Sequence, residues 1–175
     1  LLIDAGVDLD LKDKNGLTAL RSAVNDGNIE CAKLLINAKA DLDLKDKYDR
    51  TALMSAAFKG NAGCVELLID AKPDLDLKDK HGRTALMNAA SMGHTQCVVL
   101  LIDAGGDLFS NSYSGNNALY YAEKNRNTEC VAILKKAMDS KDTVSNVSLF
   151  KGSLPNGVIA LNVAPVSSKK LKPVV

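Results

Sequence analysis

The chain has 175 residues, of which 46% are hydrophobic and only 4% aromatic, and its formal net charge is +1. That length suits one domain with or without a tail, and a core so poor in aromatic residues must pack Leu, Ile, Val and Ala, which suits close-packed helices. The balanced charge provides no field that would attract nucleic acid or anionic lipid, and no apolar run approaches the roughly 18 residues that a membrane span needs. No signal peptide is visible, and because the chain opens on Leu1 rather than Met, we expect its true N-terminus to be missing.

An exact internal repeat organises most of the chain. The string DLDLKDK occurs at 8–14, 41–47 and 74–80, each copy 33 residues after the last, and a degenerate copy, DLFSNSY, follows at 107–113. The same spacing aligns the strings LTAL, RTAL, RTAL and NNAL, and also CAKLLI, CVELLI, CVVLLI and CVAILK. A fixed period of this length is typical of a solenoid. We divide the chain into the end of a truncated preceding repeat (1–7), four repeats (8–40, 41–73, 74–106 and 107–139) and a tail (140–175).

Each unit is predicted to be a finger, a helix, a turn and a second helix. The DLDL string alternates with period two, as an extended segment does, and Asp13, Asp46 and Asp79 can close turns through their carboxylates. The following column supplies a helix N-cap, and another supplies the glycine that ends the first helix. These columns hold Thr18, Thr51, Thr84 and Asn117, and then Gly27, Gly60 and Gly93.

A 33-residue unit reading T-A-L-x-x-A-A, Gly, C-V-x-L-L-I and D-L-D resembles the ankyrin repeat. The family motif T-P-L-H-x-A is changed here, because Ala replaces its Pro in all four repeats. Its His is replaced by Arg21, Met54, Met87 and Tyr120. The resemblance covers residues 1–139 and implies an all-α solenoid of helix-turn-helix units with short extended fingers. Less specifically, the residue pattern TALM…AA…GHTxCVxLL is similar to that of ankyrin arrays in protist proteins, some of them fused to NIMA-related kinases.

The fourth repeat is predicted to be a C-terminal cap. The column of Ile36 becomes Lys135, and the column of Val24 becomes Glu123, so two positions that should contact a following repeat are charged. Gly93 is replaced in this unit by Arg126. The tail after Ser140 is compatible with a linker, with a segment lying on the last repeat or with a hairpin at roughly 148–163, and the sequence does not choose among them.

The residues that could carry chemistry are interpreted as structural. The four cysteines (Cys31, Cys64, Cys97 and Cys130) recur at helical positions that stacking places about 8–10 Å apart, too far for a shared zinc ion or a disulfide. We expect this column to be buried and reduced. His94 is expected to be structural and His81 solvated, and no nucleophile–base pairing or phosphate-binding motif is found. We therefore expect no enzyme activity, no metal and no cofactor.

Surface columns that differ between repeats indicate the binding face. The resemblance places a groove on the fingers and on the outward side of each first helix. The predicted partner-binding residues are Lys47, Tyr48, Arg50, Phe58, Lys59, Lys80, His81, Arg83, Met92 and Tyr113. Tyr121 is expected beside them on the first helix of the last repeat. Aromatic residues and Arg are common interface anchors, and the cationic fingertips favour an acidic segment of another protein.

The sequence thus predicts a monomeric protein–protein interaction module in the cytoplasm, with the nucleus also compatible. The alternative hypothesis is an autoregulatory or targeting region of a larger enzyme such as a kinase. Nucleic-acid binding through the fingertips is disfavoured, because Asp13, Asp46 and Asp79 stand beside the lysines and the array has no clustered basic run.

Overall fold

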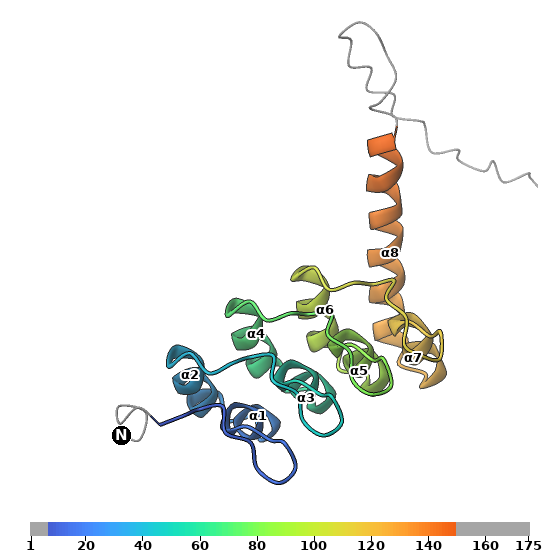
Figure 1. The fold of residues 1–175 in the computed structure, drawn as a ribbon. Helices are drawn as coiled ribbons and strands as arrows, with labels where there is room; N and C mark the ends of the chain where they lie inside the picture. Colours follow the sequence, from blue (N-terminus) through green and yellow to red (C-terminus); the bar gives the residue numbers. More distant parts are fainter. Residues whose placement is uncertain (1–6, 150–175) are drawn as a thin grey trace, which may run out of the picture.

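A computed structural model describes the backbone of residues 7–149 and the side chains of residues 7–140. This part of the chain contains helices and no strand, as the predicted all-α solenoid requires. The helices are α1 (Ala19–Asn25), α2 (Ile29–Asn37), α3 (Ala52–Lys59), α4 (Ala62–Asp70), α5 (Ala85–Met92), α6 (Thr95–Asp103), α7 (Ala118–Lys124) and α8 (Thr128–Leu149). Consecutive pairs stack in chain order, with α1, α3, α5 and α7 in one row and α2, α4, α6 and α8 in the other (Figure 1).

The first helix of every repeat begins at the predicted cap. Thr51 is extended, with φ −87° and ψ 172°, and its side chain accepts a hydrogen bond from the N–H of Met54. Thr18 and Thr84 cap α1 and α5 in the same way, and the Asn117 side chain accepts from Tyr120 N–H at the start of α7. Each cap satisfies one of the N–H groups that the first turn leaves without a partner, so these short helices start at defined residues.

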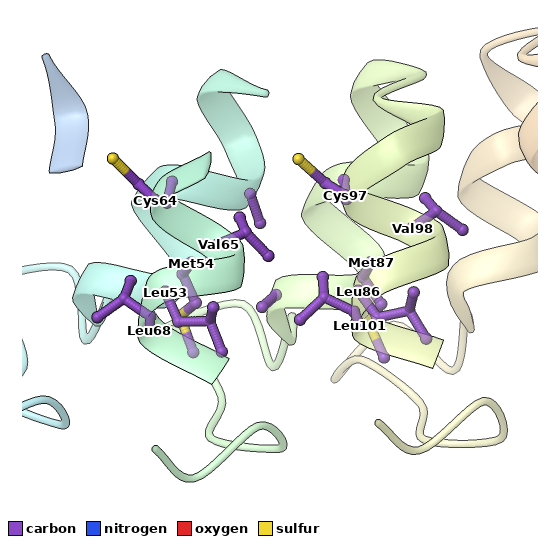
Figure 2. Close-up of a cluster of buried hydrophobic side chains, with 14 of the residues drawn as sticks. Leu53, Met54, Cys64, Val65, Leu68, Leu86, Met87, Cys97, Val98 and Leu101 are labelled. Atoms are coloured by element: carbon purple, nitrogen blue, oxygen red, sulfur yellow. The ribbon is translucent and has the colours of Figure 1, made fainter. Parts of the chain in front are cut away.

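The core is a periodic layer between the stacked helix pairs. Leu53, Val65 and Leu68 are at most 1% exposed, and the same column positions are filled one repeat later by equally buried residues. Figure 2 shows these two sets of side chains arranged alike in adjacent repeats. Leu, Val, Ala, Met and Cys supply almost all of this core, whereas the Ile residues that were also expected there are only partly buried among the described residues. Because each set contacts the next, one continuous core runs through the array.

The repeated aspartate of the KDK string closes each finger loop. We name the loops finger 1 (8–17), finger 2 (41–50), finger 3 (74–83) and finger 4 (107–116). In finger 2, Asp46 Oδ1 accepts hydrogen bonds from the N–H groups of Tyr48 at 2.7 Å and Arg50 at 2.9 Å. Asp13 and Asp79 do the same in their fingers, which confirms their predicted role as turn closers.

The DLDL segments form turns rather than a strand ladder, so their period-two pattern has another cause. The first Asp of each copy bonds the backbone N–H two residues on, as Asp41 does to Asp43. The second Asp reaches the next repeat, and Asp43 accepts the N–H of Asp74 at 3.2 Å. The alternation therefore reflects one local and one inter-repeat hydrogen bond per copy.

Lysine completes the connection between fingers. Lys12 Nζ donates to the carbonyl oxygen of Lys45 at 3.0 Å, and Lys45 Nζ donates to the carbonyl of Lys78 at 3.2 Å. Backbone bonds run between fingertips as well, for example from Lys80 N–H to the Tyr48 carbonyl at 3.1 Å. The heptapeptide is thus repeated because most of its polar residues form hydrogen bonds either within their own turn or with the adjacent finger.

The glycine column is required by backbone conformation and by close packing. Gly60 has φ 75°, and a Cβ there would lie 2.5 Å from Nδ1 of His94 in the next repeat. At Gly93, with φ 76°, a Cβ would lie 2.8 Å from Asn127 Oδ1. His94 itself is held by its Nε2, which is 3.1 Å from the Phe58 carbonyl oxygen, so its role is structural as predicted.

Repeat four ends the contacts of the array among the described residues. Lys135 and Glu123 are both exposed and form an ion pair at 2.9 Å, where the other repeats have apolar residues. The last helix, α8, continues past Ser140 to Leu149. Residues 148 and 149, where the hairpin was expected to begin, are helical. The other residues of the expected hairpin lie outside the described part of the chain.

Arg126→Gly should raise the melting temperature. Arg126 has φ 60°, the left-handed conformation that its column counterparts assign to Gly. Such a conformation costs a non-glycine residue about 1 kcal/mol, which corresponds to roughly 2–4 °C in a domain of this size. Thermal unfolding followed by circular dichroism measures the shift.

Gly60→Ala is the matched control for Arg126→Gly. It should lower the melting temperature, because its new Cβ would both strain the backbone and collide with His94. A loss of stability in Arg126→Gly would contradict the strain assigned to this turn.

Candidate functional site

A groove of about 750 Å³ lies between the fingers and the first helices of repeats one to three. Its walls come from α1, α3 and α5 and from the tips of fingers 2 and 3. The lining includes Tyr48, Arg50, Phe58, Lys59, Lys80, His81 and Arg83, all of them predicted site residues. The stacking of the first helices and the bonds between fingers bring these residues together, although they are spread over 36 positions of sequence.

Tyr48 is the centre of a cationic cluster at the edge of this groove. The Nζ atoms of Lys80 and Lys47 lie 4.1 and 5.2 Å from the centroid of its ring, and the guanidinium carbon of Arg50 lies 4.8 Å away. Cations are attracted to the negative face of an aromatic ring. Three cationic side chains therefore gather around the exposed Tyr48 ring. The two lysines bring positive charge to this fingertip, whereas the charge of Arg50 is balanced by its ion pair with Asp46.

Two arginines share one buried carboxylate at the groove floor. Asp46 Oδ2 lies 2.6 Å from Nη1 of Arg21 and 2.9 Å from Nη2 of Arg50. Burial alone would raise the pKa of Asp46. The backbone N–H of Arg50, the side chains of both arginines and the N–H of Tyr48 outweigh that effect and lower the pKa to about 2. The Asp46 carboxylate therefore stays ionised and fixes finger 2 to α1.

The remaining predicted residues flank the groove or differ from expectation. Lys47 bonds Asn15 Oδ1 at 2.8 Å across the fingers, whereas Met92 and Tyr113 are exposed, at 46% and 75%, but do not line the groove. Tyr121 was expected on the surface beside the groove, and this expectation is wrong. It is 7% exposed, its hydroxyl donates to Ser112 Oγ, and the Arg83 guanidinium of repeat three lies 4.8 Å from the centroid of its ring.

The two predicted arginines also have contacts within the chain. Arg50 is bound to Asp46, and the Arg83 guanidinium lies 4.8 Å from the centroid of the Tyr121 ring. Both guanidinium groups therefore already have a contact within the chain, and they are less available to a binding partner than an unpaired surface side chain is. The surface that is open to a partner is formed mainly by Tyr48, Phe58 and the lysines.

Several lining residues were not predicted from sequence. They are Arg21, Ser22, Met54, Ser55, Asp79 and Asn88. The sequence indicates Arg21 and Met54 only as replacements of the family His, and Asp79 only as a residue that closes a turn. The available signal was the change of residue type within a column, because Arg21 stands where the next two repeats have Met.

The cysteine column is buried in three repeats and exposed in one. Cys64, Cys97 and Cys130 are at most 1% exposed, but Cys31 is exposed, which corrects the expectation for that residue. The cause is the direction of the side chains, since Cys130 Sγ lies 3.7 Å from Oγ1 of Thr95 in the preceding repeat, and Cys64 and Cys97 point the same way in Figure 2. In the described part of the chain no helix pair precedes α1 and α2 to cover Cys31.

The buried thiols are chemically quiet. Burial raises the pKa of the Cys64 and Cys130 thiols and, with Cys130 nearby, raises the pKa of Cys97 to about 11. Within the described residues, no group of three or more His, Cys, Asp or Glu side chains is placed to hold a metal ion. Among residues 7–149, no helix combines the length and apolar character that crossing a bilayer requires.

Stacked helix pairs, capped by Thr and linked through finger loops, define an α-solenoid repeat protein. The family model described as ankyrin repeats in three copies matches residues 1–79 and, in a second match, residues 59–144. The chain therefore belongs to the ankyrin-repeat family, whose members are generally protein–protein interaction modules. Among curated proteins, none matches this sequence significantly.

Asp46→Asn should destabilise the protein by about 3 kcal/mol at neutral pH, because Arg21 would stay buried without a countercharge. The depressed pKa stabilises the folded state fully above the unfolded value of 3.8, and this contribution is lost as the pH falls toward the folded value of about 2. The difference in free energy of unfolding between wild type and variant, measured by urea unfolding, should therefore become smaller as the pH falls over that interval. Asp49→Asn, on the exposed side of the same finger, is the control, and a difference independent of pH would contradict the assignment.

Thiol titration should separate Cys31 from the other three cysteines. One thiol should react rapidly with Ellman's reagent in the native protein and four after denaturation, because all four are free and three are buried. Elemental analysis after dialysis should find no stoichiometric zinc. Rapid reaction of all four thiols in the native state would show that the cysteine column is not packed as described.

Proposed function

We propose that this chain binds another protein through the groove formed by the fingers and first helices of repeats one to three. The observation that carries the proposal is the convergence of exposed aromatic and cationic side chains there. Tyr48 and Phe58, which line the groove, are 36% and 43% exposed. Side chains of this kind contribute most when a partner covers them.

The charge of the groove supports a partner segment with acidic residues. Lys47 and Lys80 converge on the Tyr48 ring, and Lys59 lines the groove further along. A partner carboxylate near this cluster would be attracted at long range, which increases the association rate and fixes the orientation of binding. We expect the chain to act without catalysis, as a monomer, in a reducing compartment such as the cytoplasm, where its four free thiols are stable. The alternative, a regulatory region of a larger enzyme such as a kinase, uses the same groove, and the full-length gene distinguishes the two.

Replacing Tyr48 and Phe58 together by Ser should abolish partner capture without unfolding the protein. Truncating a true anchor costs about 2 kcal/mol or more of binding, or roughly 30-fold in affinity, whereas exposed substitutions usually change stability by less than about 0.5 kcal/mol. The measurement combines affinity capture from cell extract with a melting curve. Arg50 and Arg83 are left unchanged, since both have partners within the chain.

The matched control replaces Lys33 and Glu66, which are exposed on α2 and α4, by Ser. A photo-crosslinking residue at position 58 should form adducts with the captured protein, and the same residue at position 66 should not. Capture that survives the groove variant but is lost in the control would place binding on the second helices instead. If neither variant matters, the segment from Lys141 onward becomes the better candidate.

A further inference from the structure

The contact between repeats one and two shows how this fold buries a guanidinium group. Arg21 Nε donates to Ser55 Oγ at 2.7 Å, and Arg21 Nη1 lies 2.6 Å from Asp46 Oδ2. The side chains of Arg21 and Asp46 are only 6% and 1% exposed. The ion pair with Asp46 and the bond to Ser55 offset part of the cost of burying this charge, although Arg21 Nη1 itself has no hydrogen-bond partner.

One repeat further along, the acceptors recur and the donor does not. Asp79 stands at the position of Asp46 and Asn88 at the position of Ser55, but Met54 replaces Arg21. Asp79 is 6% exposed, Asn88 5% and Met54 2%, and all three line the groove. The contact between repeats two and three therefore places a carboxylate and an amide in the groove floor with an apolar side chain between them.

Each of these two side chains keeps an oxygen without a partner among residues 7–140. Asp79 Oδ1 closes the turn of finger 3, but no cation of the described residues pairs with this carboxylate, and the Asn88 side chain has no hydrogen bond there. Arg83 is the counterpart of Arg50, which binds Asp46, yet its guanidinium lies over the Tyr121 ring and its Nε has no hydrogen-bond partner. The Asp79 carboxylate is largely buried, its free oxygen is still reached from the groove, and no countercharge stands beside it, so this place favours an incoming cation.

We propose that the site formed by Asp79 and Asn88 receives an arginine side chain of the bound partner. The planar guanidinium can pair with Asp79 Oδ2 and donate to the amide oxygen of Asn88 together, as Arg21 pairs with Asp46 and donates to Ser55, while its aliphatic stem contacts Met54. Lysine carries a compact charge and lacks the fork that two separated acceptors require. The proposal rests on the proposed function, since it takes the groove to be the interface, and it adds one specific residue type to the partner.

The direct test uses N-acetyl-arginine methylamide as the probe, followed by NMR on labelled protein. The probe should shift the side-chain amide signals of Asn88 and the backbone signals of His81 and Arg83, in the millimolar concentration range. The citrulline analogue, which has the same shape without the charge, should give much smaller shifts, and Asp79→Asn should abolish the response. Equal shifts from both probes, or shifts at Asn88 from N-acetyl-glutamate methylamide, would overturn the proposal.

A second test asks whether the acceptors accommodate an arginine from the chain itself. Met54→Arg should change the melting temperature by less than about 3 °C, because Asp79 and Asn88 supply the missing partners, and it should abolish binding of the arginine probe. Met87→Arg is the matched control. Its acceptor positions hold Ser112 and Tyr121, which are bonded to each other at 3.0 Å, so it should lose about 10 °C or more.

Equal destabilisation by the two arginine substitutions would overturn the proposal independently of the probe. The outcomes of the probe and capture experiments also distinguish a failure of the arginine site from a failure of the proposed interface. Probe binding without capture of any protein would refute the interface while the arginine site stands. Capture that depends on Tyr48 and Phe58 but not on Asp79 would keep the interface and refute the arginine site.

Discussion

Each repeat of this protein can bury the apolar faces of its two helices only against the repeat before and the repeat after it. A unit of 33 residues is too small to form its own core, so Leu53 and Val65 become buried because the helix pairs of adjacent repeats stack on those of repeat two. Stability is therefore a property of the contacts between units. The same constraint explains why the packing columns hardly change along the chain, since every internal unit faces an identical neighbour.

Hydrogen bonds between fingers recur with the same 33-residue period, and they fix how each finger lies against the next. Asp43 accepts the N–H of Asp74, and Lys45 donates to the carbonyl of Lys78, so every finger is held to the next by at least two bonds. These bonds orient the fingers side by side and turn a row of loops into one wall of a groove. The seven-letter string is thus an inter-repeat connector as well as a loop, and its loss in finger 4 coincides with the end of the stacked pairs.

The candidate site arises where the period is broken. Asp46 is matched with Arg21 and Arg50, whereas Asp79 has neither, because Met54 replaces one arginine position and Arg83 turns to Tyr121. A buried carboxylate therefore has different consequences in adjacent repeats. In the first it joins two repeats, and in the second it is left facing the groove, where a partner can complete it.

The sequence by itself determined the repeated helix pairs, the helix caps at Thr51 and its equivalents and the turn-closing role of Asp46, because these depend on local hydrogen bonds and on a period that the sequence shows directly. It also indicated the fingertip residues of the groove. Only the tertiary structure decided that Cys31 is exposed, that Tyr121 is buried and that Asp79 lacks a cation. Each of those outcomes depends on which side chain of a neighbouring repeat fills a given space, and a column of similar letters does not record that choice.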